Sequence, residues 1–110
     1  MRHPLYQLKA EFFTTLGHPV RIRVLELLSE REHGVSELLA MLEIEPANLS
    51  RQLAVLRRAG LVTTRTQGPA VRYSLTSPQL GELTTVARSI LTEVLSRQIE
   101  LFQDLRPTKE

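Results

Sequence analysis

The spacing of apolar residues changes twice along this chain, and these changes limit the folds that it can adopt. Up to Gly60 the apolar positions recur every three or four residues, as in helices that pack on one side. Over 62–75 they alternate with polar residues around a Gly68-Pro69 turn, which predicts a β-hairpin. From Ser77-Pro78 onward the helical spacing returns. The chain is therefore expected to be mainly α with one β-hairpin.

Glycine and proline residues divide the first part of the chain into four predicted helices. The first runs over about 4–16, and Gly17 separates it from the second, which begins at His18-Pro19. Gly34 interrupts the chain again, and Ser36 is expected to cap a short third helix that follows it.

The remaining boundaries complete the order of elements. The fourth helix is predicted over 46–59, because Pro46 suits a first turn and Gly60 suits a left-handed C-cap. The last helix is expected from Pro78 to about Phe102. The order α-α-α-α-β-β-α is that of a winged helix-turn-helix, an α+β fold in which the second helix of the pair enters the major groove of DNA.

The length and composition indicate one domain without membrane contact. The 110 residues predict a single domain over 1–106, with a flexible tail over 107–110. No apolar run approaches the roughly 18 residues of a membrane span, and the first residues do not resemble a signal peptide. The absence of cysteine excludes disulfides, thiolate metal sites and a cysteine nucleophile.

Positive charge is concentrated in the middle of the chain. The segment 46–81 contains no Asp or Glu but carries five arginines, which are Arg51, Arg57, Arg58, Arg65 and Arg72. The flanking segments hold nine basic and twelve acidic residues, so the net charge of +2 arises entirely from this segment. A local basic surface is the electrostatic signature of polyanion binding, and a merely solvated basic face has the same composition.

The fourth predicted helix has a face suited to the major groove. Leu49, Leu53 and Leu56 share one side of it, and small or polar residues occupy the other. Small side chains allow close approach, Arg can bind guanine or phosphate, and Asn can make a bidentate contact to adenine. The hairpin can lie along the backbone or the minor groove. The predicted DNA-binding residues are Arg21, Ala47, Asn48, Ser50, Arg51, Arg65, Gln67 and Arg72.

The first and last predicted helices carry wider apolar stripes than one small core requires. We therefore expect a homodimer, because two-fold symmetric operators are bound by two-fold symmetric proteins. The alternative is that both helices only cover the core of one monomer. The expected interface residues are Leu5, Leu8, Phe12, Leu83, Ile90, Leu91 and Val94.

Three segments resemble the arsenic-repressor (ArsR/SmtB) family. The run from Leu16 to Leu28 is similar to the family's second helix, the run from Leu49 to Val62 to its recognition helix and first wing strand, and the run from Val71 to Leu75 to its second strand. The resemblance implies a homodimeric repressor in the bacterial cytoplasm, associated with the nucleoid. It would bind an inverted-repeat operator on double-stranded DNA through helix 46–59 and wing 62–75, and an effector would release it.

The chain departs from this family at its metal sites. The cysteines that many members place in the third helix correspond here to Gly34 and Ser36, and no histidine follows His33 to complete a site in the last helix. No metal and no cofactor are therefore expected, and the effector is not sensed by cysteine. A small-molecule effector and regulation by expression level both stay open.

The histidines and the remaining function classes complete the predictions. His18 is expected to cap or pack at a helix start, and His33 is expected to lie with Glu32 on a solvated surface.

An enzyme is not expected, because no Gly-rich phosphate loop, nucleophile elbow or metal-ligand cluster is present. The alternative function is a winged-helix module that binds another protein.

Overall fold

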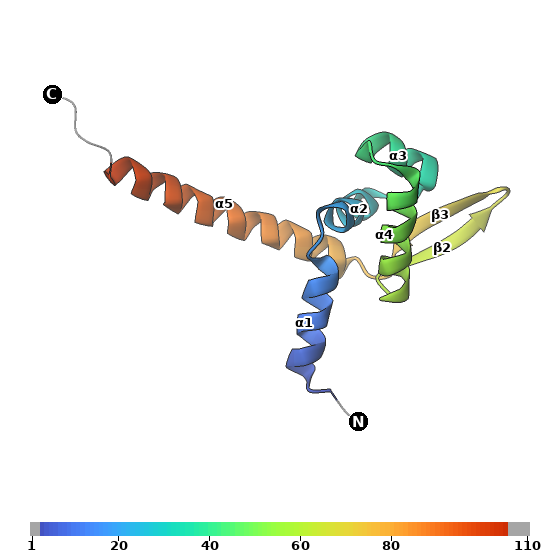
Figure 1. Cartoon of the computed structure of the whole chain (residues 1–110), viewed down its shortest axis with the longest axis horizontal. Coiled ribbons are helices and arrows are strands. Elements are labelled where there is room, and N and C mark those ends of the chain that lie inside the picture. The colour runs from blue at the N-terminus through green and yellow to red at the C-terminus, as the bar shows by residue number, and fades with distance from the viewer. Residues whose placement is uncertain (1–2, 106–110) are drawn as a thin grey trace.

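A computed structural model describes residues 3–105 (Figure 1). The elements are α1 (Leu5–Leu16), α2 (Pro19–Glu30), β1 (His33–Gly34), α3 (Val35–Leu42), α4 (Pro46–Arg58), β2 (Val62–Gln67), β3 (Ala70–Leu75) and α5 (Gln79–Leu105). The predicted mainly α winged helix-turn-helix is confirmed, with β1 as an additional short strand. The predicted tail over 107–110 lies outside the described residues.

Local capping interactions set the ends of the helices. The Nδ1 atom of His18 accepts a hydrogen bond from the Val20 N–H at 3.2 Å, so His18 caps α2 as expected. Gly60 has a φ of 78°, and the N–H of Leu61 returns to the Leu56 carbonyl at 3.0 Å, which closes α4. The prediction for Ser36 is wrong, because α3 begins directly after Gly34 and Ser36 lies inside its first turn.

The core is built around α2, which packs against the other four helices and β3. Each buried aliphatic side chain stabilises the fold by roughly 1.5–3 kcal/mol relative to its exposed state. These side chains come from α2, α3, α4 and β2, and they are Val24, Leu25, Leu27, Leu28, Leu38, Leu49, Leu53, Leu56 and Val62.

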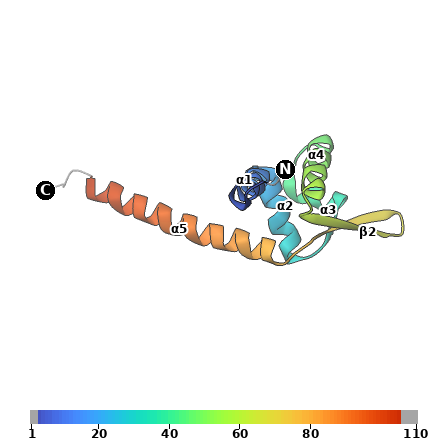
Figure 2. The same ribbon diagram turned by 90° about the horizontal axis from the view of Figure 1, so that it is seen from below.

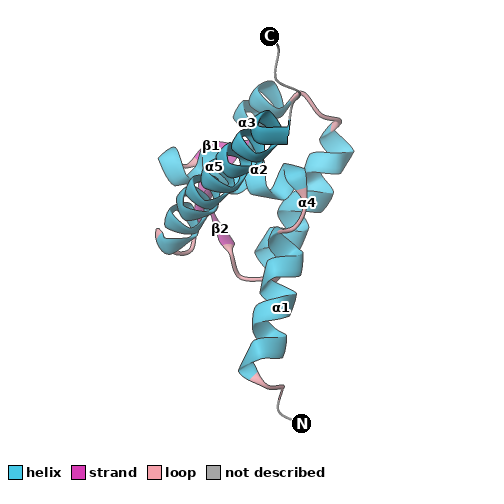
Figure 3. Cartoon of the chain, turned by 90° about the vertical axis from the view of Figure 1, so that its left-hand side faces the viewer, coloured by secondary structure: helices cyan, strands magenta, loops and turns pink. Residues whose placement is uncertain are grey.

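The three strands form one antiparallel sheet in the order β1-β3-β2. The hairpin of β2 and β3 extends away from the helices, and Figure 3 colours the strands magenta among the cyan helices. In β1, His33 pairs with Tyr73 and Gly34 with Arg72. Because β1 pairs with β3, His33 is only 1% exposed, and the prediction of a solvated His33 is wrong.

Two helices project from the winged core in different directions (Figures 1 and 2). The radius of gyration is 18.4 Å, whereas a compact domain of this length has about 13 Å. No residue of α1 is buried, and the buried residues of α5 are Leu80 and Gly81 in its first turn. Within residues 3–105, no helix combines the length and the apolar composition that crossing a membrane requires.

Candidate nucleic-acid interface

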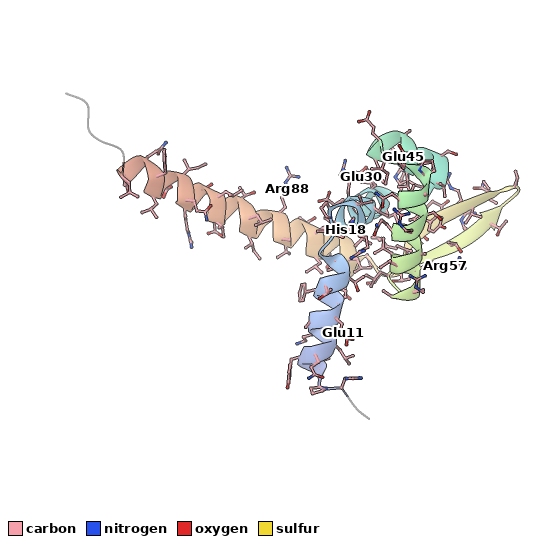
Figure 4. The ribbon with its side chains drawn as sticks, viewed as in Figure 1. Glu11, His18, Glu30, Glu45, Arg57 and Arg88 are labelled. Atoms are coloured by element: carbon pink, nitrogen blue, oxygen red, sulfur yellow. The ribbon has the colours of Figure 1, made fainter. Side chains whose placement is uncertain are left out.

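Helix α4 follows α3 after a short connection and presents a polar outer face. Its inner face buries Leu49, Leu53 and Leu56 in the core. Ala47, Ser50 and Arg51 are exposed on the other side, as predicted from the spacing. Figure 4 marks the two ends of this helix by Glu45 and Arg57. The exposed face is free of acidic side chains over 46–58, so its charge favours an anion.

A polar residue on the inner face of α4 was not predicted. Gln52 is only 8% exposed, and it lies three residues after Leu49 and four before Leu56. Its Nε2 donates to Oδ1 of Asn48 at 3.0 Å, and Asn48 is half-buried. The signal in the sequence was a glutamine on an otherwise apolar stripe.

Arg21 does not face outward as a DNA-binding side chain would. Its Nε donates to the Thr15 carbonyl at 2.6 Å, and its Nη1 donates to Oε1 of Gln52 at 2.9 Å. The guanidinium therefore joins the end of α1 to the inner face of α4. The DNA contact predicted for Arg21 stays a prediction, and these internal partners favour a structural role for the side chain.

The two wing arginines lie directly opposite each other, since Arg65 pairs with Arg72 in the β2–β3 register. Like charges in such positions repel each other, and two carboxylates compensate for them. Arg65 binds Glu32 through Nε at 2.9 Å and through a second contact from Nη2, and its side chain remains 54% exposed. Gln67 is exposed at the end of β2, beside the turn.

Arg72 is held more tightly than Arg65. Its side chain is 22% exposed, its Nη1 donates to Oε1 of Glu37, and its Nη2 donates to the Glu32 carbonyl at 3.4 Å. The DNA contact predicted for Arg72 stays a prediction, and these partners favour a structural role for its side chain. Sequence spacing could not reveal these pairs, because Glu32 and Glu37 lie 33 to 40 residues before their arginine partners.

The carboxylates of this network are strongly stabilised in the charged form. The pKa of Glu37 falls from 4.5 to about 2, because the Gly34 N–H, Arg31, Arg72 and His33 all hydrogen-bond to it. The pKa of Glu32 is lowered mainly by the hydrogen bond from Arg65, which in turn raises the pKa of Arg65. The network is therefore fully charged at neutral pH, and it fixes the base of the wing to α3.

The projecting helices carry most of the predicted dimer residues on their exposed surface. Exposure is 40% or more for five of them, which are Leu5, Leu8, Ile90, Leu91 and Val94, while Phe12 and Leu83 are half-buried. Between α1, α2 and α5 lies an open groove of about 500 Å³, whose apolar lining includes Phe13, Leu16, Ile22, Leu83, Leu91 and Leu95. A water-exposed apolar surface of this extent is typical of an interaction site.

Metal-binding chemistry is not apparent in the described part of the chain. No three histidine or carboxylate side chains within residues 3–105 gather as a metal site would require.

The helix pair, the exposed basic face and the wing together define a winged helix-turn-helix DNA-binding protein. Residues 18–64 match the family described as "Bacterial regulatory protein, arsR family". The chain is 55% identical to the uncharacterized HTH-type transcriptional regulator Rv0081 of Mycobacterium tuberculosis over 104 residues. The matched segment covers 94% of this chain and 91% of that protein. The chain therefore belongs to the arsR family of bacterial regulatory proteins: it is a DNA-binding transcription regulator and not an enzyme.

Solved structures have the same fold. The crystal structure of M. tuberculosis Rv0081 superimposes with a TM-score of 0.81 at 55% identity, covering 89% of this chain and 99% of that one. The crystal structure of the transcriptional repressor BigR from Xylella fastidiosa superimposes with a TM-score of 0.68 at 34% identity, covering 80% of this chain and 87% of that one. The homodimeric winged helix-turn-helix domain of Mb0332 from Mycobacterium bovis superimposes with a TM-score of 0.75 at 22% identity, covering 84% of this chain and 86% of that one.

Proposed function

We propose that this protein is a homodimeric repressor that binds an inverted-repeat operator in the bacterial cytoplasm, at the nucleoid. Helix α4 enters the major groove, and the wing follows the neighbouring backbone or minor groove. The observation that carries this proposal is the exposed, acid-free face of α4, with Ala47, Ser50 and Arg51 side by side near its N-terminal end. Reading at this end agrees with the geometry of helix-turn-helix complexes.

The side chains divide into contacting and supporting groups. Ala47, Asn48, Ser50 and Arg51 on α4 are the proposed groove contacts, and Arg65 and Gln67 are the proposed wing contacts. Arg65 also pairs with Glu32, but its side chain remains 54% exposed. Arg21 and Arg72 have supporting roles instead, because they are half-buried and their guanidinium groups donate to partners inside the chain.

The dimer is supported by the apolar surfaces of α1 and α5. A monomer would leave Leu91 58% and Ile90 55% exposed, together with the apolar groove beside α2. A second copy covers these surfaces and places two α4 helices for two half-sites. The homodimeric state named for the Mb0332 domain and the repressor role named for BigR agree with this proposal.

A footprint on the DNA upstream of the gene, at low and high salt, tests the function. Protection of an inverted repeat, with half-sites about one helical turn apart or a multiple of it, is expected. Protection should weaken steeply as salt rises, because phosphate contacts release counterions. Failure to bind any duplex at low salt would point instead to a winged-helix module that binds another protein.

A reporter fused to the protected region tests the direction of regulation. Expression of the protein is expected to lower transcription, and a rise would make the protein an activator. The same reporter separates a small-molecule effector from control by expression level. An effector restores transcription at constant protein concentration, whereas control by expression level requires a change in that concentration.

A further inference from the structure

A continuous series of hydrogen bonds connects the end of α1 to Asn48 on α4. Arg21 donates to the carbonyls of Thr15 at 2.6 Å and Thr14 at 3.5 Å, and to Oε1 of Gln52 at 2.9 Å. Gln52 then donates from Nε2 to Oδ1 of Asn48 at 3.0 Å. The relay, Arg21–Gln52–Asn48, thus links two half-buried side chains through a buried one.

The chemistry of arginine fixes the direction of every bond in this relay. A guanidinium has donors and no acceptor, so the amide oxygen of Gln52 must face Arg21. The amide nitrogen of Gln52 must then face Asn48, whose oxygen accepts it. Reversing Gln52 would set N–H groups against N–H groups, and at 8% exposure water cannot compensate fully for the lost bonds.

The remaining group of the Asn48 amide is therefore its Nδ2, which can only donate. Within residues 3–105, no hydrogen bond from this nitrogen to the protein is present. We propose that Arg21 and Gln52 are positioning residues that set the base preference of Asn48, by directing its Oδ1 towards Gln52 and leaving its Nδ2 to donate to a base. This inference rests on the proposed function, in which α4 reads the major groove.

The orientation predicts which bases are preferred. Guanine offers N7 and O6 as major-groove acceptors, whereas cytosine offers only its N4 donor. A donor at Asn48 therefore favours guanine over cytosine at the contacted position. The bidentate contact to adenine expected from the sequence needs Oδ1 as an acceptor as well, and one of the two lone pairs of that oxygen already accepts from Gln52.

The test begins with sites selected by the wild-type protein from a random duplex library. Asn48→Ala identifies the contacted base pair as the one whose preference disappears. Gln52→Glu then keeps an acceptor for Arg21 but presents a second acceptor to Asn48. The Asn48 amide must turn, so its oxygen faces the groove, and the ratio of affinities for guanine over cytosine is expected to reverse by about five-fold or more.

A second variant makes the test independent of changes in the buried glutamine. Asn48→Asp presents an acceptor to the groove while Gln52 still donates to its other oxygen, and the same reversal is expected. Gln103→Glu is the matched control, because it adds the same charge at an exposed position of α5 and should leave the ratio unchanged. Circular dichroism confirms that each variant is folded.

The outcomes separate the two proposals. If folded Gln52→Glu retains the wild-type ratio, or if Asn48→Ala alters no base preference, the positioning role of the relay is refuted while DNA binding stands. If the wild-type protein selects no sites at low salt, the proposed function itself fails.

Discussion

Arg72 in the wing donates from Nη1 to Oε1 of Glu37, in the first turn of α3. The pair joins residues that are 35 positions apart, and Arg65 lies directly across the hairpin from Arg72. The wing is thus bound to the helix-turn-helix by charge at its base, while its tip remains free of the core. Acidic side chains outside the basic segment hold the arginines in place.

Acidification is expected to weaken the fold through Glu37. Its pKa is about 2 in the folded protein and 4.5 ordinarily, so the folded state favours the charged carboxylate. This stabilisation is complete above the ordinary pKa and is lost as the pH falls from about 4.5 towards about 2. Urea unfolding across this range measures it. Glu37→Gln should show a shallower loss with pH than wild type, and equal slopes for the two proteins would contradict the prediction.

Removal of the Arg51 side chain is expected to weaken operator binding by about 1–3 kcal/mol and to relax base preference. The side chain is exposed on the outer face of α4, near the end that reads the groove. Competition binding with operator and mutated duplexes measures both effects for Arg51→Ala. Arg97→Ala is the control, because it removes the same charge from an exposed position on α5. Equal affinity of Arg51→Ala and wild type would remove Arg51 from the reading surface.

A charge on the apolar side of α5 is expected to separate the two copies of the chain. Leu91 is 58% exposed and lines the groove between the projecting helices and α2. Leu91→Glu would bury a carboxylate in the proposed interface, which is costly without a partner. Sedimentation equilibrium should show a shift from dimer to monomer. Ser89→Glu, on another side of the same helix, should remain dimeric, and a dimeric Leu91→Glu would place the interface elsewhere.

Gly81→Ala is expected to destabilise the protein although alanine favours helices by about 1 kcal/mol over glycine. A Cβ at position 81 would lie 2.7 Å from the Cβ of Ser29, so α5 and α2 would have to move apart. Overpacking of this kind costs about 1–3 kcal/mol. Thermal unfolding tests this prediction. The double variant Gly81→Ala with Ser29→Gly should regain stability, and a Gly81→Ala protein as stable as wild type would show that the helices have room.

The sequence predicted the elements well where a local signal marked them. Pro19 and Pro46 begin helices, Gly60 takes a positive φ at the end of α4, and the alternation over 62–75 corresponds to the hairpin. These signals depend on a few neighbouring residues, and the backbone restrictions of proline and glycine act in any context.

The sequence was less informative where distant residues meet. β1 has two residues, too few for a visible alternation, and His33 became buried only because β3 pairs with it. Arg21 and Arg72 were predicted to face DNA from their charge and position. Their partners, Gln52 and Glu37, lie 31 and 35 residues away, and no local pattern encodes such pairs.

The exposed length of α5 also affects how operator occupancy depends on protein concentration. Beyond its first turn this helix has no buried residue in the single chain, and in the proposed dimer a second copy covers its apolar side. If assembly requires two copies, the concentration of the operator-binding species rises with the square of protein concentration while monomers predominate. A modest fall in synthesis, or dilution by cell growth, would then empty an operator more abruptly than a monomeric regulator could.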